Sequence, residues 1–356
     1  MKPTEQLHDL GQSLWLDNIT RTMLGDGTLR RYVEELAVTG LTSNPTIFDK
    51  AISGTDAYDE QIAAVGPGAA STEELFFELA LADLREAADL FKPVHARTDG
   101  VDGFVSLEVS PLLADDAAAT IEQARRLHEA AERPNLFIKI PGTEAGHTAI
   151  EETIYAATPV NVTLLFSREH YRGAADSYMR AVERRIEAGL DPAVPSVASV
   201  FISRWDKAVT GEVPNELRDR LGIAIAMRTY AAYRELLDSE RWQRLANQGA
   251  RPQRLLFAST GTKDPDASDV LYVEALAAPN TVNTMPEPTL EHFADHGSVG
   301  EPLPADGGDT EDVLAEFASA GVDVDALGAR LQEEGKQSFD DSWRELLGTI
   351  ESELAK

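Results

Sequence analysis

The sequence predicts a closed (β/α)8 barrel of parallel strands, and three observations lead to this fold class. Short apolar runs alternate along the chain with long amphipathic runs, which is the pattern of a parallel sheet with crossover helices. The apolar runs number eight, as a closed barrel requires. No G-x-G-x-x-G motif follows the first run, so the rival open, doubly wound sheet is the less favoured architecture.

The predicted strands are the short apolar runs bounded by turn residues. They are Leu14–Asn18, Val38–Thr42, Gly103–Val109, Asn135–Ile140, Val160–Phe166, Ser196–Ile202, Arg254–Ser259 and Asn280–Met285. Helical periodicity is clearest over Thr72–Phe91, Asp116–Ala131, Arg168–Ala188 and Asn215–Leu245. Ser71 and Glu74 have the spacing of a capping box at the start of the first of these helices.

The segment after the eighth strand departs from this alternation. It begins with a predicted loop rich in proline, glycine and acidic residues, Pro286–Asp309, and two helical stretches follow, Glu311–Ala320 and Val324–Ser352. Because no further strand comes after them, we expect one barrel domain over residues 1–356. Residues 310–356 should then form C-terminal helices packed on the barrel or over its mouth.

Composition limits the classes of function. The chain has 356 residues, no cysteine and a formal net charge of −29, from 61 acidic and 32 basic residues. The charge argues against a nucleic-acid partner, and the lack of cysteine excludes disulfides and thiolate metal sites. We find no signal peptide or membrane span, so we expect a cytoplasmic protein with no membrane partner, and we leave room for a homo-oligomer. The net negative charge of the protein would repel a phosphorylated substrate, so its binding site would need cations placed close by.

Lys139 is the most informative residue, because it is the only charged side chain in the apolar run 135–142. Desolvation penalises an ammonium group, so a lysine in such a place is either held by partners or used in its neutral form. A neutral amine can attack a carbonyl group and form a Schiff base. The alternative is a lysine that extends from the strand end to water.

Other polar residues follow or end the neighbouring strands. Glu108 lies near the end of the third strand and Thr163 on the fifth, so both should flank Lys139 within reach of a bridging water. Asp17 ends the first strand, Asn44 follows the second, and Asn161 shares a face with Thr163. Taken singly, these could be helix N-caps or a satisfied core amide, but together they predict a site at the carboxyl ends of the strands.

Strands six and seven predict an anion site. Ser199, Phe201 and Arg204 end the sixth strand, and Ser259 to Lys263 form a small, hydroxyl-rich turn after the seventh. An arginine, a lysine and such a turn make a phosphate cradle at the position where barrels often bind phosphate. The competing interpretation is a helix N-cap with a surface lysine.

Five segments in this order resemble the transaldolase family over nearly the whole chain. They are Leu16-Asp17-Asn18, Leu41-Thr42-Ser43-Asn44-Pro45-Thr46, Phe137-Ile138-Lys139-Ile140-Pro141, Asn161-Val162-Thr163-Leu164-Leu165-Phe166-Ser167 and Ser199-Val200-Phe201-Ile202-Ser203-Arg204. The resemblance implies a class I aldolase-type barrel that needs no cofactor and no metal. It also implies that Lys139 forms the Schiff base with a ketose phosphate.

The resemblance also implies roles for the other residues. Asp17 would be the acid/base on the sugar hydroxyl, while Glu108 and Thr163 would hold the water that moves protons during imine formation. The residues implied to bind substrate are Asn44, Asn161, Ser199, Phe201, Arg204 and Ser259. Many relatives have an arginine shortly after the serine of strand seven, where this chain has Lys263, so Lys263 as its replacement is our inference. Separately from the resemblance, a transferase must protect its intermediate from protonation, and C-terminal helices carrying Phe339 and Trp343 could cover the mouth and keep water out.

Two further motifs have weaker functional interpretations. Glu291–His296 contains two histidines four residues apart, but it lacks the H-E-x-x-H pattern, and a solvated surface segment is favoured over a metal site. Gly142–Gly146 could bind an anion, although a turn and helix cap is the commoner arrangement for such a sequence.

The predicted function is transfer of a dihydroxyacetone unit from a ketose phosphate to an aldose phosphate, a transaldolase reaction of the non-oxidative pentose phosphate pathway. Donors would be sedoheptulose 7-phosphate or fructose 6-phosphate, and acceptors glyceraldehyde 3-phosphate or erythrose 4-phosphate. Two alternatives remain open at this point. One is an aldolase of the fructose-6-phosphate type that releases free dihydroxyacetone, and the other is a sugar-phosphate-binding barrel without catalysis.

Overall fold

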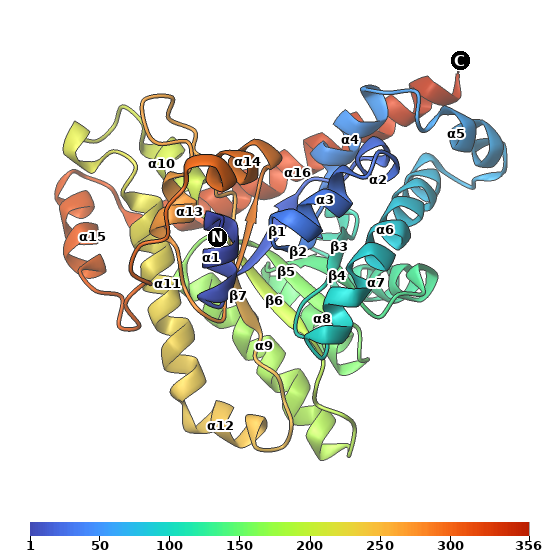
Figure 1. The fold of residues 1–356 in the computed structure, drawn as a ribbon. Helices are drawn as coiled ribbons and strands as arrows, with labels where there is room; N and C mark the ends of the chain where they lie inside the picture. The colour runs from blue at the N-terminus through green and yellow to red at the C-terminus, as the bar shows by residue number, and fades with distance from the viewer. Residues whose placement is uncertain (356) are drawn as a thin grey trace.

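The structure is a computed structural model that describes residues 1–355. Within that range the strands form a closed, all-parallel barrel in sequence order, with β1 paired to both β2 and β8 (Figure 1). The strands are β1 (Ser13–Asp17), β2 (Val38–Thr42), β3 (Val105–Glu108), β4 (Leu136–Pro141), β5 (Val160–Leu165), β6 (Ser196–Phe201), β7 (Arg254–Ala258) and β8 (Val282–Met285). The predicted fold class is confirmed, and every predicted strand is present.

Helices precede, connect and follow these strands. They are α1 (Pro3–Asp9), α2 (Arg21–Gly25), α3 (Thr28–Glu35), α4 (Pro45–Ser53), α5 (Asp59–Val65), α6 (Thr72–Arg97), α7 (Ala117–Ala131), α8 (Glu144–Tyr155), α9 (Arg168–Glu187), α10 (Ser203–Val209), α11 (Leu221–Asp238), α12 (Glu240–Ala246), α13 (Leu271–Ala275), α14 (Glu287–His296), α15 (Thr310–Ser319) and α16 (Val324–Leu354). Short 3-10 turns are η1 (Gly66–Gly68), η2 (Pro111–Leu113) and η3 (Asn215–Leu217). None of the helices in residues 1–355 combines the length and apolar character that crossing a membrane requires.

The inward face of the barrel changes from apolar to polar along the strands. At the amino end, Phe104 and Phe137 stack with ring centroids 4.1 Å apart, and Trp15 packs on Phe137 at 6.0 Å. Two residues further along their strands, the same face carries Asp17 and Lys139. The aromatic layer therefore closes one end of the barrel, and the polar layer lies at the carboxyl ends of the strands.

Trp15 also explains a glycine in β2. A Cβ added to Gly40 would lie 2.7 Å from the Trp15 ring and 2.7 Å from the Phe104 carbonyl oxygen. The indole N–H of Trp15 donates to Asp102 at 2.8 Å, so the ring is fixed in the interior by a buried hydrogen bond. Only glycine leaves room for the indole at this height of the barrel.

The α16 helix crosses the barrel mouth and ends beside α4 and α5 (Figure 1). The Gln332 side-chain amide on α16 donates to the carbonyl oxygens of Gly142, after β4, at 3.1 Å and of Leu164, in β5, at 3.0 Å. Trp343, further along α16, packs edge-on to Phe76 of α6 with ring centroids 5.0 Å apart. The helix is thus tied both to the strand ends and to the outer helix layer.

Two predicted segments differ from the structure. The predicted loop Pro286–Asp309 is wrong in its first part, because α14 occupies Glu287–His296; Pro286 and Pro288 are tolerated there because they stand at and just inside the start of the helix. The helical stretch Asn215–Leu245 divides into η3, α11 and α12. Ser239 ends α11 and caps α12 by accepting the Trp242 N–H at 3.2 Å.

The start of α11 depends on a residue from another helix. The Asp206 carboxylate of α10 accepts the N–H groups of Leu221 at 2.9 Å and Gly222 at 3.0 Å, and the Tyr272 hydroxyl donates to it at 2.8 Å. Burial raises the pKa of Asp206 to about 6. Because this cap comes from outside the segment, local periodicity could not locate the helix boundary.

The capping box predicted at α6 is present in a shifted form. The Ser71 hydroxyl accepts the Glu74 N–H at 3.1 Å, and the Glu74 carboxylate accepts the N–H of Ala70, one residue before the cap, at 2.7 Å.

The domain boundaries, one domain over residues 1–356 with 310–356 as its C-terminal helices, stay a prediction.

Candidate active site

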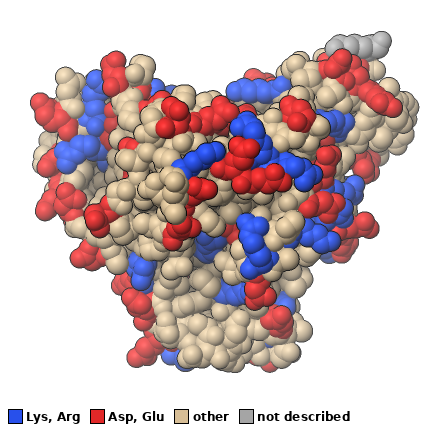
Figure 2. Space-filling model, in the orientation of Figure 1, with Lys and Arg blue, Asp and Glu red and all other residues tan. Residues whose placement is uncertain are grey.

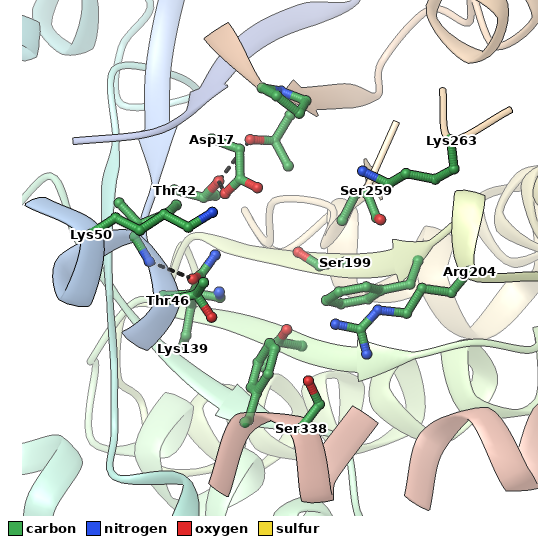
Figure 3. A pocket seen from close by; sticks show the side chains of 18 residues that line it. Asp17, Thr42, Thr46, Lys50, Lys139, Ser199, Arg204, Ser259, Lys263 and Ser338 are labelled. Carbon is green, nitrogen blue, oxygen red and sulfur yellow. Dashed lines mark hydrogen bonds between the residues drawn. The ribbon is translucent and has the colours of Figure 1, made fainter. Parts of the chain in front are cut away.

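A pocket of about 320 Å³ opens at the carboxyl ends of the strands (Figure 3). Nine of the predicted site residues line it, namely Asp17, Asn44, Lys139, Thr163, Ser199, Phe201, Arg204, Ser259 and Lys263. Glu108 and Asn161 lie behind this wall and contact residues that form it. The structure therefore brings the predicted set together at one end of the barrel.

Lys139 is buried at the base of the pocket and does not extend to water, with 6 % of its surface exposed. Its Nζ donates to the Ser43 carbonyl oxygen at 3.0 Å and to Glu108 Oε2 at 3.1 Å. Glu108 and Lys139 are register partners on β3 and β4, so the barrel itself sets their side chains next to each other. Glu108 contacts the amine directly, and not only through the bridging water that the sequence suggested.

Glu108 can exchange a proton with this amine. Burial raises the pKa of Glu108, and the charge and hydrogen bond of Lys139 oppose the rise. A carboxylate with a raised pKa is a stronger base than an exposed glutamate, so it can accept the proton that an ammonium must lose before it attacks a carbonyl. An amine and a carboxylate in this contact can act as a nucleophile and the base that deprotonates it.

Asp17, at the end of β1, is a carboxylate that lines the pocket itself. Burial raises the pKa of Asp17, while Lys139, a hydrogen bond from Thr42 and Lys263 oppose the rise. The Thr42 hydroxyl donates to Asp17 Oδ1 at 2.7 Å and contacts the Thr284 hydroxyl at 2.7 Å. Asp17 thus faces the cavity, and its raised pKa makes its carboxylate a stronger base than that of an exposed aspartate, as an acid/base residue requires.

Thr163 enters the pocket from an irregular part of β5. The pairing of β5 with β6 shifts register between Val162 and Leu165, and Leu164 between them has φ +58°. A non-glycine residue in this left-handed region is strained, and such strain is found at sites where a side chain must be redirected. The buried Thr163 hydroxyl has no hydrogen-bond partner within residues 1–355, so it is free to bind a water or a substrate oxygen.

Asn161 and Asn44 each have a structural contact as well as a predicted role. Asn161 is fully buried between Ser106, which accepts from its amide at 3.2 Å, and Ser199, which donates to its Oδ1 at 2.7 Å. It therefore orients Ser199, and Ser199 is the one that lines the pocket. Asn44 caps α4 by accepting the Ile47 N–H at 3.1 Å, yet it also lines the pocket.

Cations form the wall opposite the amine. Figure 3 shows Arg204 and Lys263 pointing into the cavity beside Ser259. Neither cation has a carboxylate within ion-pairing distance in the described part of the chain. Burial lowers the pKa of Lys263, and the nearby positive charge of Lys207 lowers it further. Uncompensated positive charge in a protein of net charge −29 indicates a site for an anion.

Ser259 has a backbone conformation that fits this role. Its φ is +57°, and its hydroxyl contacts the Ser203 hydroxyl at 2.9 Å. The Ser203 N–H donates to the Ser259 carbonyl oxygen at 3.1 Å, so the ends of β6 and β7 are joined at this point. The strained turn presents a hydroxyl and backbone groups to the cavity beside the two cations.

The sequence comparisons agree with this geometry. The family model for transaldolase/fructose-6-phosphate aldolase matches residues 14–350. A transaldolase of Frankia alni is 44% identical over 99% of this chain and 98% of its own length. Transaldolases of Saccharopolyspora erythraea, at 44% identity, and Thiobacillus denitrificans, at 42%, each cover 98% of this chain and 97% and 100% of their own lengths.

The chain belongs to the transaldolase/fructose-6-phosphate aldolase family. The match extends over all the strands from Leu14 of β1 onward and over most of α16. The family prediction made from the sequence segments is confirmed.

Several residues lining the pocket of this family member were missed in the sequence. They are Thr42, Thr46, Ile47, Lys50, Ala258, Thr284, Pro286 and Ser338. Lys50 is the most informative of these, because it is a further cation without an ion pair in residues 1–355. Thr46 and Lys50 are four residues apart on α4, directly after the N-cap Asn44, so helical spacing could have placed both on the pocket side.

The two remaining motifs lie outside the pocket. On α14, His292 and His296 both contact Asp269, at 2.8 and 2.9 Å, on the surface. No group of three or more possible metal ligands occurs in residues 1–355. Thr143 of the segment Gly142–Gly146 caps α8 by accepting the Gly146 N–H at 3.0 Å, as the turn-and-cap interpretation predicts.

Proposed function

We propose that this protein is a transaldolase, which transfers a dihydroxyacetone unit from a ketose phosphate to an aldose phosphate through an imine on Lys139. The observation that carries the proposal is the buried Lys139–Glu108 contact at 3.1 Å, in a pocket that also contains Asp17 and faces unpaired cations. The shared name of the relatives supports the same reaction. On the face shown in Figure 2, acidic and basic side chains are interspersed over the surface.

The first step would be imine formation. Lys139, after giving a proton to Glu108, attacks the C2 carbonyl carbon of the ketose phosphate, and the carbonyl oxygen leaves as water. That oxygen needs two protons: one moves to it from the attacking nitrogen and the other is the proton that Glu108 returns, so a protonated imine remains on Lys139. Thr163, whose hydroxyl has no partner within residues 1–355, would hold the departing water or the one that later hydrolyses the imine.

The second step would be cleavage of the carbon–carbon bond. Asp17 takes the proton of the C4 hydroxyl, the C3–C4 bond breaks, and its electron pair moves to the iminium nitrogen to give an enamine. The first aldehyde leaves. The enamine then attacks the aldehyde carbon of the acceptor, Asp17 returns the proton to the new hydroxyl, and hydrolysis frees Lys139.

The cations opposite the amine would bind the substrate phosphate. Arg204 and Lys263 would attract it against the overall negative field and hold it by charge-assisted hydrogen bonds, with Ser259 as a further donor. With the phosphate at one wall, the C2 carbonyl of a six- or seven-carbon ketose can reach Lys139 at the other. Phe201, 8 % exposed, forms an apolar wall between the two.

The test of the covalent step is borohydride reduction in the presence of fructose 6-phosphate, followed by mass spectrometry of peptides. We expect a three-carbon adduct on Lys139, because reduction converts an imine into a stable secondary amine. Labelling of another lysine, or of none, would contradict the proposal and favour a barrel that binds sugar phosphates without catalysis.

A second experiment separates transfer from simple aldol cleavage. With donor alone, a transferase should release one aldehyde per active site and then nearly stop, until erythrose 4-phosphate or glyceraldehyde 3-phosphate restarts it. Steady release of dihydroxyacetone at a rate comparable to transfer would identify an aldolase instead. Asp17→Ala should form the imine but stall before cleavage, so its covalent complex should accumulate.

A further inference from the structure

Arg204 is held in an unusual way for an arginine in this protein. Arg21, Arg180, Arg184, Arg228 and Arg241 all make close ion pairs with carboxylates. Arg204 is largely buried, yet no carboxylate lies within ion-pairing distance and no hydrogen bond to its guanidinium is present within residues 1–355. An arginine side chain has many rotamers in solution, so something else must fix its direction.

Two aromatic rings enclose the guanidinium group. The Arg204 Cζ lies 5.1 Å from the ring centroid of Phe201, on β6, and 5.8 Å from that of Phe339, on α16. The two rings are 6.4 Å apart and inclined at 65°. Aromatic faces attract a cation without neutralising it, so the charge stays available to a ligand. Glu334, the acidic neighbour on α16, is paired instead with Arg330 at 3.6 Å.

Gly335, one turn before Phe339, brings the α16 backbone close to the same group. A Cβ added at Gly335 would lie 3.2 Å from Arg204 Nη1, 3.1 Å from Leu164 Cδ2 and 3.3 Å from Phe166 Cζ. Glycine lowers the stability of a helix interior, and here it stands within a helix of 31 residues. The close approach to Arg204 and β5 accounts for its presence.

We propose that Gly335 and Phe339 of α16 are positioning residues that hold Arg204 ready for the substrate phosphate without compensating its charge. This rests on the proposed function, in which Arg204 binds phosphate. An ion pair would fix the guanidinium equally well, but the phosphate would then have to displace a carboxylate. The aromatic contact and the helix backbone fix it with no such competitor, and they make the phosphate site depend on the C-terminal helix.

The test uses one donor with phosphate and one probe without it. Steady-state transfer from fructose 6-phosphate to unphosphorylated glyceraldehyde gives KM and kcat. The rate of borohydride trapping of dihydroxyacetone on Lys139 reports imine formation without any phosphate. Phe339→Leu should raise KM for fructose 6-phosphate about three- to ten-fold, with the trapping rate of dihydroxyacetone unchanged. Gly335→Ala should do the same, because the added Cβ displaces the guanidinium.

Two variants on the same helix serve as controls. Gly348→Ala makes the same substitution where an added Cβ would meet nothing within 4 Å, so KM should stay at the wild-type value. Trp343→Leu loosens the packing of α16 on Phe76, at 5.0 Å, without touching Arg204, so it should lower thermal stability but leave KM unchanged. A rise in KM for Trp343→Leu equal to that for Phe339→Leu would overturn the inference, because loosening of α16 would then explain both.

Arg204→Ala distinguishes failure of this inference from failure of the proposed phosphate role. If Arg204→Ala raises KM for fructose 6-phosphate while Gly335→Ala and Phe339→Leu do not, the inference is wrong and the phosphate role stands. If Arg204→Ala leaves KM unchanged, the phosphate role itself is wrong. An equal loss of dihydroxyacetone trapping and of fructose 6-phosphate turnover in Phe339→Leu would also overturn the inference, since it would point to a general disturbance of the site.

Discussion

The two walls of the pocket differ in whether their charged side chains have partners within the protein. On the wall of β1 and β4, Lys139 contacts Glu108 at 3.1 Å, and Asp17 accepts from Thr42 at 2.7 Å. On the opposite wall, which follows the ends of β6 and β7, Arg204 of α10 and Lys263 have no carboxylate partner within the described residues. This difference in pairing favours a different use for each wall. Proton transfer needs an acid and a base in contact, whereas anion binding needs positive charge that nothing in the protein has already satisfied.

We call the side of the pocket with Lys139, Glu108 and Asp17 the paired wall, because its charged groups contact one another or a hydroxyl group. Substitutions there should affect catalysis, and Lys139→Arg should have the largest effect of any substitution. Arginine keeps a positive charge beside Glu108, but a guanidinium cannot form the imine. Turnover should fall by more than about 10⁴-fold, as expected for loss of a covalent nucleophile. The measurements are transfer activity and circular dichroism. Retained turnover in a folded variant would mean that the reaction does not pass through Lys139.

We call the side with Arg204 and Lys263 the unpaired wall, and substitutions there should affect recognition of the substrate phosphate. Arg204→Ala should lower kcat/KM for fructose 6-phosphate about ten- to a hundred-fold, because a charge-assisted hydrogen bond is lost. The trapping rate of unphosphorylated dihydroxyacetone should change little. Lys263→Ala should follow the same pattern more mildly. Equal losses for phosphorylated and unphosphorylated substrates would remove Arg204 from the phosphate site, and no change in Lys263→Ala would contradict its assignment as a replacement for arginine.

The pH dependence tests the protonation of the paired wall. Because burial raises the pKa of Asp17, cleavage should weaken as pH falls through this raised value, at a pH above that of an exposed aspartate. Thr42→Val removes the hydrogen bond that favours the ionised form of Asp17, so the acidic limb should move to still higher pH. The position of this acidic limb is measured from the rate of aldehyde release in a single turnover as a function of pH. A limb that does not move would show that another group controls the cleavage step.

The same raised pKa has a consequence for folding. A carboxyl whose pKa is higher in the folded than in the unfolded protein costs free energy when it ionises. For Asp17 this cost is absent below the unfolded pKa and complete above the folded one, so its contribution to stability declines as pH rises between the two. If Asp17 is the acid/base residue that we propose, its raised pKa lowers the stability of the folded protein at neutral pH.

The sequence was sufficient for the barrel and for most residues of the paired wall. Strand periodicity located both ends of every strand to within two residues, because a short apolar run between two helical segments is seldom anything but a buried strand. Lys139 stood out because a charge inside an apolar run needs a reason. Glu108 and Thr163 followed from the rule that chemistry gathers at the carboxyl ends of barrel strands.

What the sequence could not give depends on contacts between distant segments. The α16 helix was predicted, but its hydrogen bonds from Gln332 to Gly142 and Leu164 could not be, because helical periodicity does not say what a helix covers. Phe339 does line the pocket, as a helix over the mouth implies, whereas Trp343 packs on Phe76 in the outer layer. The split of the segment Asn215–Leu245 was missed for the same reason.

Lys50 does not fit this division between the two walls. It is an unpaired cation, yet it lies on the same side of the cavity as Asp17 and Lys139 (Figure 3). If unpaired cations serve the phosphates, Lys50→Ala should raise KM for phosphorylated substrates about two- to three-fold with kcat unchanged, and the effect should fade at high salt because the side chain is exposed. Lys92→Ala, which removes the same charge from the surface of α6, controls for the change in net charge. A fall in kcat at unchanged KM would instead place Lys50 with the chemistry of the paired wall.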